Sequence, residues 1–154
     1  MESIVDLVVS SPHDPDSAAL ILELNELLDD LYHPDENHFR LDAAEVAGDR
    51  GIFILARVDG RPTGCGALRL TEDGRSEVKR MYVRPAAQGR GVGRMILNRL
   101  EDEARRLGAT GMLLEMGNRQ PEARALYESV GFAPLPCWGE YLATPGSVCL
   151  GKDL

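Results

Sequence analysis

Apolar and polar residues alternate along the chain with two periods, one typical of strands and one typical of helices. Residues 3–11 are apolar and rich in β-branched side chains, which predicts a first strand. A helix is expected from Pro15 onward, because Asp14 is a good N-cap and the leucines up to Leu31 recur on one helical stripe. The polar, irregular residues that follow are expected to contain a short helix at 42–47.

The next three apolar segments lie between residues 51 and 83 and predict three strands. The first two segments end in Asp-Gly, at residues 59–60 and 73–74, a dipeptide that favours tight hairpin turns. The third ends at Arg84-Pro85. The short spacing between the segments predicts an antiparallel meander.

The rest of the chain alternates helices and strands. Helices are expected at 89–108 and 120–131, where apolar residues recur on one face and a glycine ends each segment. Strands are expected at 111–117, 132–138 and 146–154. The order β-α-α-β-β-β-α-β-α-β-β predicts a single α+β domain with a mixed sheet over residues 1–154, a length sufficient to bury a substantial core.

Composition places the chain among ordinary globular proteins, with 44% hydrophobic and 27% charged residues. No apolar run is long enough to span a membrane, and the N-terminus lacks the features of a secretory signal. The three cysteines are far apart and are expected to be reduced, mostly buried thiols in a cytoplasmic protein. The net charge of −8 argues against binding to nucleic acid or anionic membranes and is compatible with a cationic ligand.

One stretch departs from this acidic balance. Residues 78–94 contain five basic residues and no Asp or Glu, and Gly89, Gly91 and Gly93 stand where a helix is expected to start. Free N–H groups at a helix start bind anions, and glycines let the backbone come close to them. The spacing fits neither a P-loop nor a dinucleotide-binding fingerprint. The stretch is therefore predicted to bind an anionic group through its backbone.

The pattern Gln88-x-x-Gly91-x-Gly93, directly after a strand, resembles the coenzyme A loop of the GCN5-related N-acetyltransferase (GNAT) superfamily. Residues 125–132 (ALYESVGF) resemble the second signature of the same superfamily, a helix with a tyrosine followed by Gly-Phe entering a strand. The separation of the two motifs is typical of the family. The resemblance implies a mixed, mostly antiparallel central sheet with helices on both faces, and acetyl-CoA as the acyl donor.

The resemblance also implies which residues contact acetyl-CoA. The pyrophosphate is expected at residues 88–94, and the pantetheine arm is expected along the end of the preceding strand, with sheet-like hydrogen bonds to its backbone. Members of the superfamily often place an amide side chain on this arm before the second signature, a role for Asn118 or Gln120. The implied contacts are Met81, Tyr82, Val83, Gln88, Gly89, Arg90, Gly91, Val92, Gly93, Arg94, Asn118, Gln120 and Tyr127.

Acetyl transfer to an amine needs a proton acceptor, because alkyl amines have a reference pKa of about 10.4 and are protonated near pH 7. By resemblance the candidate bases are Glu77, eleven residues before Gln88, and Glu115, twelve residues before Tyr127. Glu115 is slightly preferred, because it is expected on the less apolar face of its strand. The alternative for each is a structural carboxylate, solvated or paired with a nearby Lys79 or Arg80, with a water chain acting as the base.

The leaving thiolate needs a proton donor and the thioester carbonyl needs a hydrogen-bond donor. A tyrosine at the position of Tyr127 often protonates the thiolate in the superfamily; the alternative is a core aromatic on an apolar helical face. The backbone N–H of Val83 is expected to polarise the carbonyl. No metal site is expected.

These observations predict an N-acetyltransferase that moves an acetyl group from acetyl-CoA to a primary amine of a small molecule or peptide. Direct attack in a ternary complex is expected, because no activated Ser or Cys nucleophile is visible. The alternative is a non-catalytic acyl-CoA-binding module. A homodimer is compatible with the resemblance.

By family analogy, residues 31–41 and 134–146 wall the acceptor cleft. Their aromatic and acidic side chains suit a small cationic amine. These side chains are Tyr32, His33, Asp35, Glu36, His38, Trp138, Glu140 and Tyr141.

Overall fold

A computed structural model of the chain describes residues 3–32, 46 and 48–154. Apart from Val46, the short helix expected at 42–47 and the expected cleft residues between 33 and 41 lie outside the described residues. The helices are α1 (Pro15–Leu31), α2 (Val92–Arg106) and α3 (Pro121–Ser129). The strands are β1 (Val5–Ser10), β2 (Gly51–Val58), β3 (Arg61–Leu70), β4 (Ser76–Val83), β5 (Gly111–Gly117), β6 (Ala133–Pro134) and β7 (Ser147–Asp153).

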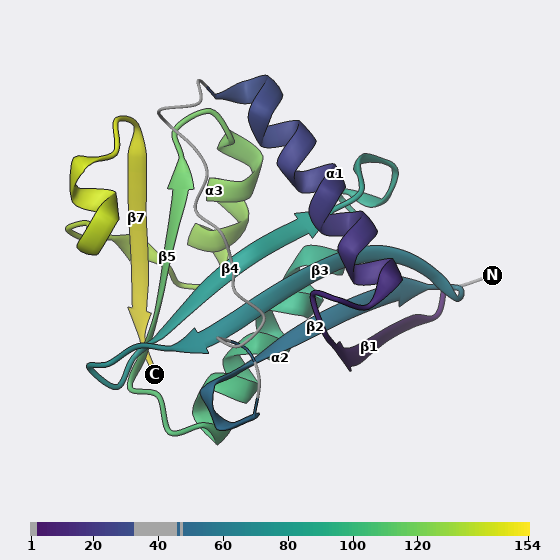
Figure 1. The fold of residues 1–154 in the computed structure, drawn as a ribbon, viewed down its shortest axis with the longest axis horizontal. Coiled ribbons are helices and arrows are strands. Elements are labelled where there is room, and N and C mark those ends of the chain that lie inside the picture. The colour runs from purple at the N-terminus through teal and green to yellow at the C-terminus, as the bar shows by residue number, and fades with distance from the viewer. Residues whose placement is uncertain (1–2, 33–45, 47) are drawn as a thin grey trace.

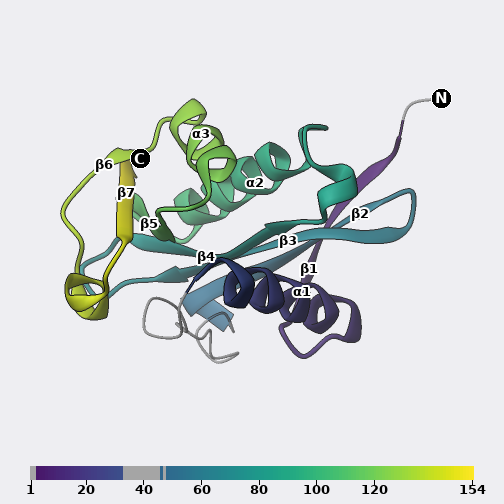
Figure 2. The same ribbon diagram turned by 90° about the horizontal axis from the view of Figure 1, so that it is seen from above.

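The strands form one seven-stranded sheet in the order β1-β2-β3-β4-β5-β7-β6 (Figure 1). Every neighbouring pair is antiparallel except β4 and β5, which are parallel. Helix α1 covers one face of the sheet, while α2 and α3 cover the other (Figure 2). The expected fold class, a mixed and mostly antiparallel sheet with helices on both faces, is confirmed.

Strand β2 explains why the sheet is covered on both sides. Its apolar run alternates between two clusters: Phe53 and Leu55 pack with Leu20 of α1, whereas Ile52 and Ile54 pack toward the residues of α2. A strand that is apolar on both faces has to be covered on both. Helix α1 begins as expected, with the Asp14 side chain accepting a hydrogen bond from the backbone N–H of Asp16 at 3.0 Å.

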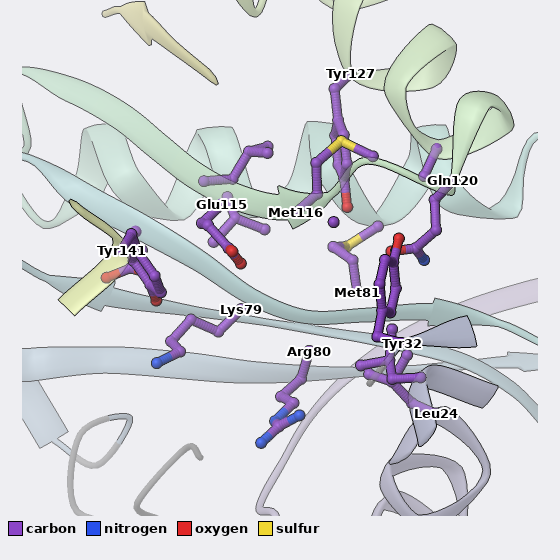
Figure 3. A pocket seen from close by; sticks show the side chains of 16 residues that line it. Leu24, Tyr32, Lys79, Arg80, Met81, Glu115, Met116, Gln120, Tyr127 and Tyr141 are labelled. Carbon is purple, nitrogen blue, oxygen red and sulfur yellow. The ribbon is translucent and has the colours of Figure 1, made fainter. Parts of the chain in front are cut away.

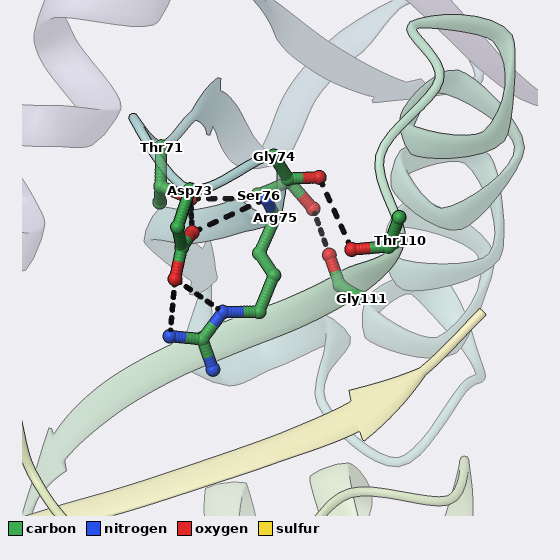
Figure 4. Close-up of polar contacts among 7 residues, drawn as sticks. All are labelled: Thr71, Asp73, Gly74, Arg75, Ser76, Thr110 and Gly111. Carbon is green, nitrogen blue, oxygen red and sulfur yellow. Dashed lines mark hydrogen bonds and ion pairs between the residues drawn. The ribbon is translucent and has the colours of Figure 1, made fainter.

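The parallel pair in the centre of the sheet is short. Strands β4 and β5 pair only at Ser76 with Met112 and at Glu77 with Leu113, and they diverge beyond these residues. The paired end is held by side-chain and turn contacts: the Ser76 hydroxyl donates to the Gly111 carbonyl at 2.9 Å (Figure 4). The same close-up shows Thr110 bonded to the carbonyl of Gly74 in the β3–β4 turn. The strands are therefore joined at one end and parted at the other.

A β-bulge bends β4 where it leaves β5. The register between β3 and β4 shifts after Cys65, and Arg80 adopts a φ of 57°, a left-handed conformation that is uncommon outside glycine. The buried Cys65 thiol donates to the Arg80 carbonyl at 3.3 Å, and the Arg80 guanidinium donates to Asn25 of α1 at 3.1 Å. These contacts hold the bulge from both sides.

The cysteines differ from the expectation of three reduced thiols. Cys137 and Cys149 form a disulfide between the segment before β7 and β7 itself, so the expectation is wrong for these two residues. Cys65 is a buried free thiol, and burial raises its pKa to about 12. Spacing along the chain did not indicate that the loop before β7 folds back onto that strand.

Two expected elements are shorter than the pattern predicted. The strand expected at 132–138 is only Ala133–Pro134 at the edge of the sheet, where a proline without an N–H is tolerated. The helix expected from Gly89 begins at Val92, because Gly89 and Gly91 take left-handed φ angles of 80° and 83°. Neither residue can then belong to a right-handed helix.

Candidate active site

A cavity lies where β4 and β5 diverge (Figure 3). Helix α1 contributes to it from one face of the sheet and α3 from the other, so the cavity has walls on both sides of the sheet. Its lining residues are Leu24, Leu28, Tyr32, Glu77, Val78, Lys79, Arg80, Met81, Leu114, Glu115, Met116, Gly117, Gln120, Ala123, Tyr127 and Tyr141. The structure thus brings together both candidate bases and the candidate acid.

Glu115 enters the cavity from β5. Its neighbours Leu114 and Met116 point into the apolar core on the α2 and α3 side, which leaves Glu115 on the opposite face as expected. Burial raises the pKa of the Glu115 carboxyl, a hydrogen bond from Ser147 lowers it, and the charge of Glu77 raises it further. The Ser147 hydroxyl donates to Oε2 at 2.5 Å, and among the described residues Oε1 has no hydrogen-bond partner.

Glu77 occupies a different environment on β4. Its side chain is 1% exposed, and Oε1 accepts two hydrogen bonds from the Arg69 guanidinium, at 3.2 and 2.7 Å. Oε2 accepts a hydrogen bond of 2.6 Å from the Tyr141 hydroxyl. The partners of Glu77 are therefore Arg69, which lies directly opposite it in the β3–β4 register, and Tyr141, rather than the Lys79 or Arg80 named for the structural alternative.

Tyr127 projects from α3 into the cavity with its hydroxyl foremost (Figure 3). The side chain is 8% exposed and packs edge-on against Phe132, with ring centroids 5.9 Å apart. Burial raises the pKa of the phenol. Its hydroxyl has no hydrogen-bond partner among the residues that the structure describes, which is uncommon for a buried polar group.

The two expected amide side chains have different surroundings. Gln120 lines the cavity and accepts a hydrogen bond of 3.3 Å from the Tyr32 hydroxyl, whereas Asn118 is exposed and does not line it. Tyr32 also accepts a hydrogen bond from the backbone N–H of Arg119 at 2.9 Å. Its ring lies against Gly117, where an added Cβ would come within 2.2 Å of it. Tyr32 therefore joins the end of α1 to the end of β5.

The glycine-rich loop connects β4 to α2. Gly91 is the N-cap of α2 and has no side chain to bond the first helical N–H groups. Gly89 and Gly91 have open space where a Cβ would stand, whereas a Cβ on Gly93 would lie 2.9 Å from Leu126 of α3. Gly93 thus allows α2 to pack closely against the Leu126 side chain of α3, and the N–H groups at the start of α2 stay available to an anion.

Several polar side chains around this loop form hydrogen bonds or ion pairs with other residues of the protein. The Gln88 amide donates to the Val83 carbonyl at 3.0 Å, and Arg94 donates to the Ser129 hydroxyl at 2.8 Å. Arg84 forms an ion pair of 2.7 Å with Glu23 of α1, which neutralises one charge of the basic stretch. Arg90 remains exposed beside the loop.

The strand residues expected beside the pantetheine arm also lie in different environments. Met81 lines the cavity, while Tyr82 is buried on the α1 face, where its hydroxyl donates to Glu23 at 3.2 Å. Val83 is paired with Gly64 of β3, so its other edge faces the gap left by β5. An extended ligand fits the unpaired edge of β4, because that edge lacks a neighbouring strand there.

Several residues of the site were not singled out in the sequence. Arg69, Ser147, Leu24 and Leu28 all contact the cavity or its carboxylates. A signal for Arg69 was present, because a hairpin turn at residues 73–74 places it opposite Glu77. No sequence signal pointed to Ser147, since its approach to Glu115 depends on the pairing of β5 with β7.

Two further features of the described residues bear on function. Within residues 3–32, 46 and 48–154, no group of three or more His, Cys, Asp or Glu side chains is arranged to hold a metal ion. Within the same residues, no helix has the length and apolar character that crossing a membrane requires.

Residues 20–132 match the model of the acetyltransferase (GNAT) family. The IAA acetyltransferase of Azospirillum brasilense is 42% identical over 151 residues, which cover 97% of this chain and 98% of that protein. A crystal structure from Klebsiella pneumoniae, assigned as an acyl-CoA N-acyltransferase, superposes with a TM-score of 0.83 at 30% identity and 98% coverage of both chains. The structure of yncA from Salmonella typhimurium with acetyl-CoA shares the fold, with a TM-score of 0.69 at 22% identity and coverage of 96% and 93%. The chain belongs to the GNAT family of acetyltransferases.

Proposed function

We propose that this acetyltransferase moves an acetyl group from acetyl-CoA to a primary amine of a small molecule or peptide, by direct attack in a ternary complex. The observation that carries the proposal is that Glu115 and Tyr127 line one cavity from opposite sides of the parted strands. A group that accepts protons and a group that donates them are thereby available to the two reactants.

The donor would lie on the α2 and α3 side of the gap. The N–H groups at the start of α2 and the exposed Arg90 suit the pyrophosphate, and the unpaired edge of β4 at Met81 and Val83 suits the peptide-like pantetheine arm. Acetyl-CoA supplies the acyl group as a thioester. Gln120, at the N-terminus of α3, can donate its amide N–H groups to the arm, since its Oε1 is the atom bonded to Tyr32.

Glu115 is proposed as the base. Its Oε1 is available to the cavity, and burial raises the pKa of the carboxyl, so that the ionised form is a stronger proton acceptor than an exposed carboxylate. Glu115 takes a proton from the acceptor ammonium, and the neutral nitrogen forms a bond to the acetyl carbon. The carbon–sulfur bond breaks at the same centre.

Tyr127 is proposed as the acid. Its hydroxyl has no described partner and points into the cavity, so it is able to donate to a leaving sulfur. Proton transfer from Tyr127 to the thiolate gives coenzyme A as the free thiol. The bonded nitrogen gives up a second proton as the amide forms, which restores the Tyr127 hydroxyl through solvent, and Glu115 releases its proton to solvent between turnovers.

The acceptor would enter from the α1 side, beside Tyr32 and Tyr141. The names of two relatives support a small molecule: the IAA acetyltransferase of Azospirillum brasilense, and an L-methionine sulfoximine/L-methionine sulfone acetyltransferase of Salmonella typhimurium that is 44% identical over 52 residues. We expect amines to be better acceptors than alcohols of the same size, because the proposed site supplies a carboxylate base.

The test is a coenzyme A release assay over a panel of amines, matched alcohols and IAA, with wild-type protein and Glu115→Gln. Wild type should release thiol only when an acceptor is present, and the rate should fall as pH drops through the raised pKa of Glu115, because the base is then protonated. Glu115→Gln should lower kcat by roughly 10²-fold or more. Glu122→Gln, on the surface of α3, is the control. Binding of acetyl-CoA without release under any acceptor would instead identify a non-catalytic binding module.

A further inference from the structure

Glu77 shares the cavity with Glu115, yet its surroundings suit a different task. We propose that Glu77 is a positioning residue, a fixed negative charge held by Arg69 and Tyr141 that keeps Glu115 a strong proton acceptor. The inference rests on the proposed role of Glu115 as the base. It assigns separate tasks to two carboxylates that the sequence alone presents as rivals.

The geometry argues against proton transfer to Glu77. One oxygen accepts two N–H groups of Arg69 and the other accepts the Tyr141 hydroxyl at 2.6 Å. With 1% of the side chain exposed, an acceptor amine would have to displace one of these donors to reach a lone pair. Glu115, by contrast, has one oxygen without a described partner.

The same contacts place a permanent positive charge against Glu77. A guanidinium does not lose its proton in proteins, and that of Arg69 lies 2.7 Å from the Glu77 carboxylate as an ion pair. Tyr141 adds a second donor from the 3-10 helix at residues 139–143. Its ring is held edge-on against Trp138, with centroids 5.3 Å apart, and the adjoining Cys137–Cys149 disulfide fixes this segment to β7.

Among the residues that the structure describes, charged and polar groups approach Glu115 from β4, β7 and the 3-10 helix. Strand β4 presents Glu77 and Lys79, β7 presents Ser147, and the 3-10 helix presents Glu140 and Tyr141. Apart from burial, Glu77 is the largest influence that raises the pKa of Glu115, whereas Lys79 lowers it. Two carboxylates in a cavity of low dielectric cannot both ionise as readily as one.

Because the Glu77 carboxylate is ion-paired with Arg69, we take Glu77 as the fixed charge and Glu115 as the carboxyl that responds to it. Glu115 then holds its proton more tightly and, once ionised, accepts one from an amine more readily. Removing the charge at position 77 should therefore weaken the base without removing it.

The test is a titration of the Glu115 carboxyl by carbon-13 NMR in wild type, Glu77→Gln, Tyr141→Phe and Glu140→Gln, with the resonance assigned by its loss in Glu115→Gln. In Glu77→Gln the pKa of Glu115 should move to lower pH, since a like charge has been removed. Tyr141→Phe keeps the charge but removes the O–H that partly shields it, so the pKa should move the opposite way. Glu140 is exposed, and its removal should shift the titration less than removal of Glu77 does.

Kinetics give a second measurement. Glu77→Gln should retain turnover, with kcat lowered by roughly tenfold and the acidic limb of the pH–rate profile displaced to lower pH, whereas Glu115→Gln should lose the limb. Melting curves and coenzyme A affinity of each variant establish that it is folded. If Glu77→Gln does not fold, the pKa of Glu115 in Tyr141→Phe is the deciding measurement. A higher pKa supports the proposal, and an unchanged pKa overturns it.

Loss of activity in Glu77→Gln as complete as in Glu115→Gln, with an unchanged Glu115 titration, would identify Glu77 as the base. The NMR measurement needs no acceptor. If wild type releases no thiol with any acceptor, the proposed function fails while the electrostatic link between the two carboxylates is still decided by the titration.

Discussion

The Tyr127 hydroxyl is buried, and none of the residues that the structure describes forms a hydrogen bond with it. Such a group lowers stability by roughly 1–3 kcal/mol compared with an apolar group of the same shape. The hydroxyl points into the cavity and burial raises its pKa, so it stays protonated across the physiological range. A destabilising feature of this kind is expected where the missing partner is a ligand.

Tyr127→Phe should therefore separate activity from stability. We expect kcat to fall by roughly 10- to 100-fold while the affinity for coenzyme A is kept, because a contact to the leaving sulfur strengthens only in the transition state. The melting temperature should be equal to or above that of wild type, because the unsatisfied hydroxyl is removed. Steady-state kinetics, calorimetry and thermal melts measure the three quantities.

Tyr82→Phe is the matched control for stability. Tyr82 is also 8% exposed, but its hydroxyl donates to Glu23, which is ion-paired with Arg84. Its loss should lower the melting temperature. If Tyr127→Phe is destabilised to the same extent and keeps full kcat, Tyr127 is only a core aromatic.

Residue identities in the site were predictable to the extent that local patterns fix them. The resemblance of two motifs to the GNAT superfamily drew attention to Glu77, Glu115 and Tyr127, and all three line one cavity. Their partners were not predictable in the same way. The contact of Tyr141 with Glu77 joins residues 64 positions apart and depends on how the last loop folds over the sheet.

At the scale of elements, the start of α2 is set by glycines whose roles differ. Gly91 caps the helix with a φ of 83°, and Gly74, in the β3–β4 turn, has a nearly equal φ of 85°. Neither would meet another atom if a Cβ were added. A side chain at either position would therefore cause similar backbone strain. Only Gly91 adjoins the proposed phosphate-binding loop, so Gly74 serves as its control.

Gly91→Ala and Gly74→Ala should each lower the free energy of unfolding by about 1–2 kcal/mol, the cost of placing a side chain in the left-handed region. Only Gly91→Ala should weaken binding of coenzyme A, by calorimetry, and Gly91→Glu should weaken it further because a negative charge enters the phosphate-binding loop. Equal affinity in all three folded variants would exclude this loop as the pyrophosphate site.

The disulfide closes the loop that carries Tyr141. Cys137 and Cys149 are 12 residues apart, and cross-linking a loop of this length stabilises a fold by roughly 3 kcal/mol. Cys137→Ala should lower the melting temperature and raise KM for the acceptor several-fold. The Kd for coenzyme A should be unchanged, because the donor is proposed to lie on the other side of the sheet.

A reductant should shift the melt of wild type to that of Cys137→Ala and leave the variant unaffected. Identical melts for wild type with and without reductant would show that the cross-link contributes nothing to stability. Element prediction failed around this loop for a related reason. Proline at 134 and 136 and the tertiary bond to Cys149 prevent a long strand there, although the apolar pattern favoured one.

At the scale of the whole molecule, the cavity has walls on both faces of the sheet. Its described lining contains no Ser, Cys, Thr or His to carry the acetyl group between two half-reactions. Initial rates measured against both substrates should therefore give intersecting lines, as expected for a ternary complex. Parallel lines, together with an acetylated protein in mass spectra, would require a covalent route.

The overall architecture was the most predictable part of the molecule. Alternating apolar positions and turn dipeptides predicted the β2–β3–β4 meander and α1, because these elements depend on local sequence. The divergence of β4 from β5 was not visible at this level. It depends on the bulge at Arg80, a residue whose left-handed conformation no local pattern predicts.

The parted strands have a consequence for the mechanics of the protein. The half of the sheet from β1 to β4 and the half from β5 to β7 share hydrogen-bonded pairing only at the Ser76 end of the seam. An extended ligand seated along β4 would supply backbone-like hydrogen bonds where a strand is missing. The bound substrate would then link the two halves of the sheet. Amide hydrogens near the open end should then exchange more slowly in the presence of the donor, and each turnover would briefly loosen the molecule as its product departs.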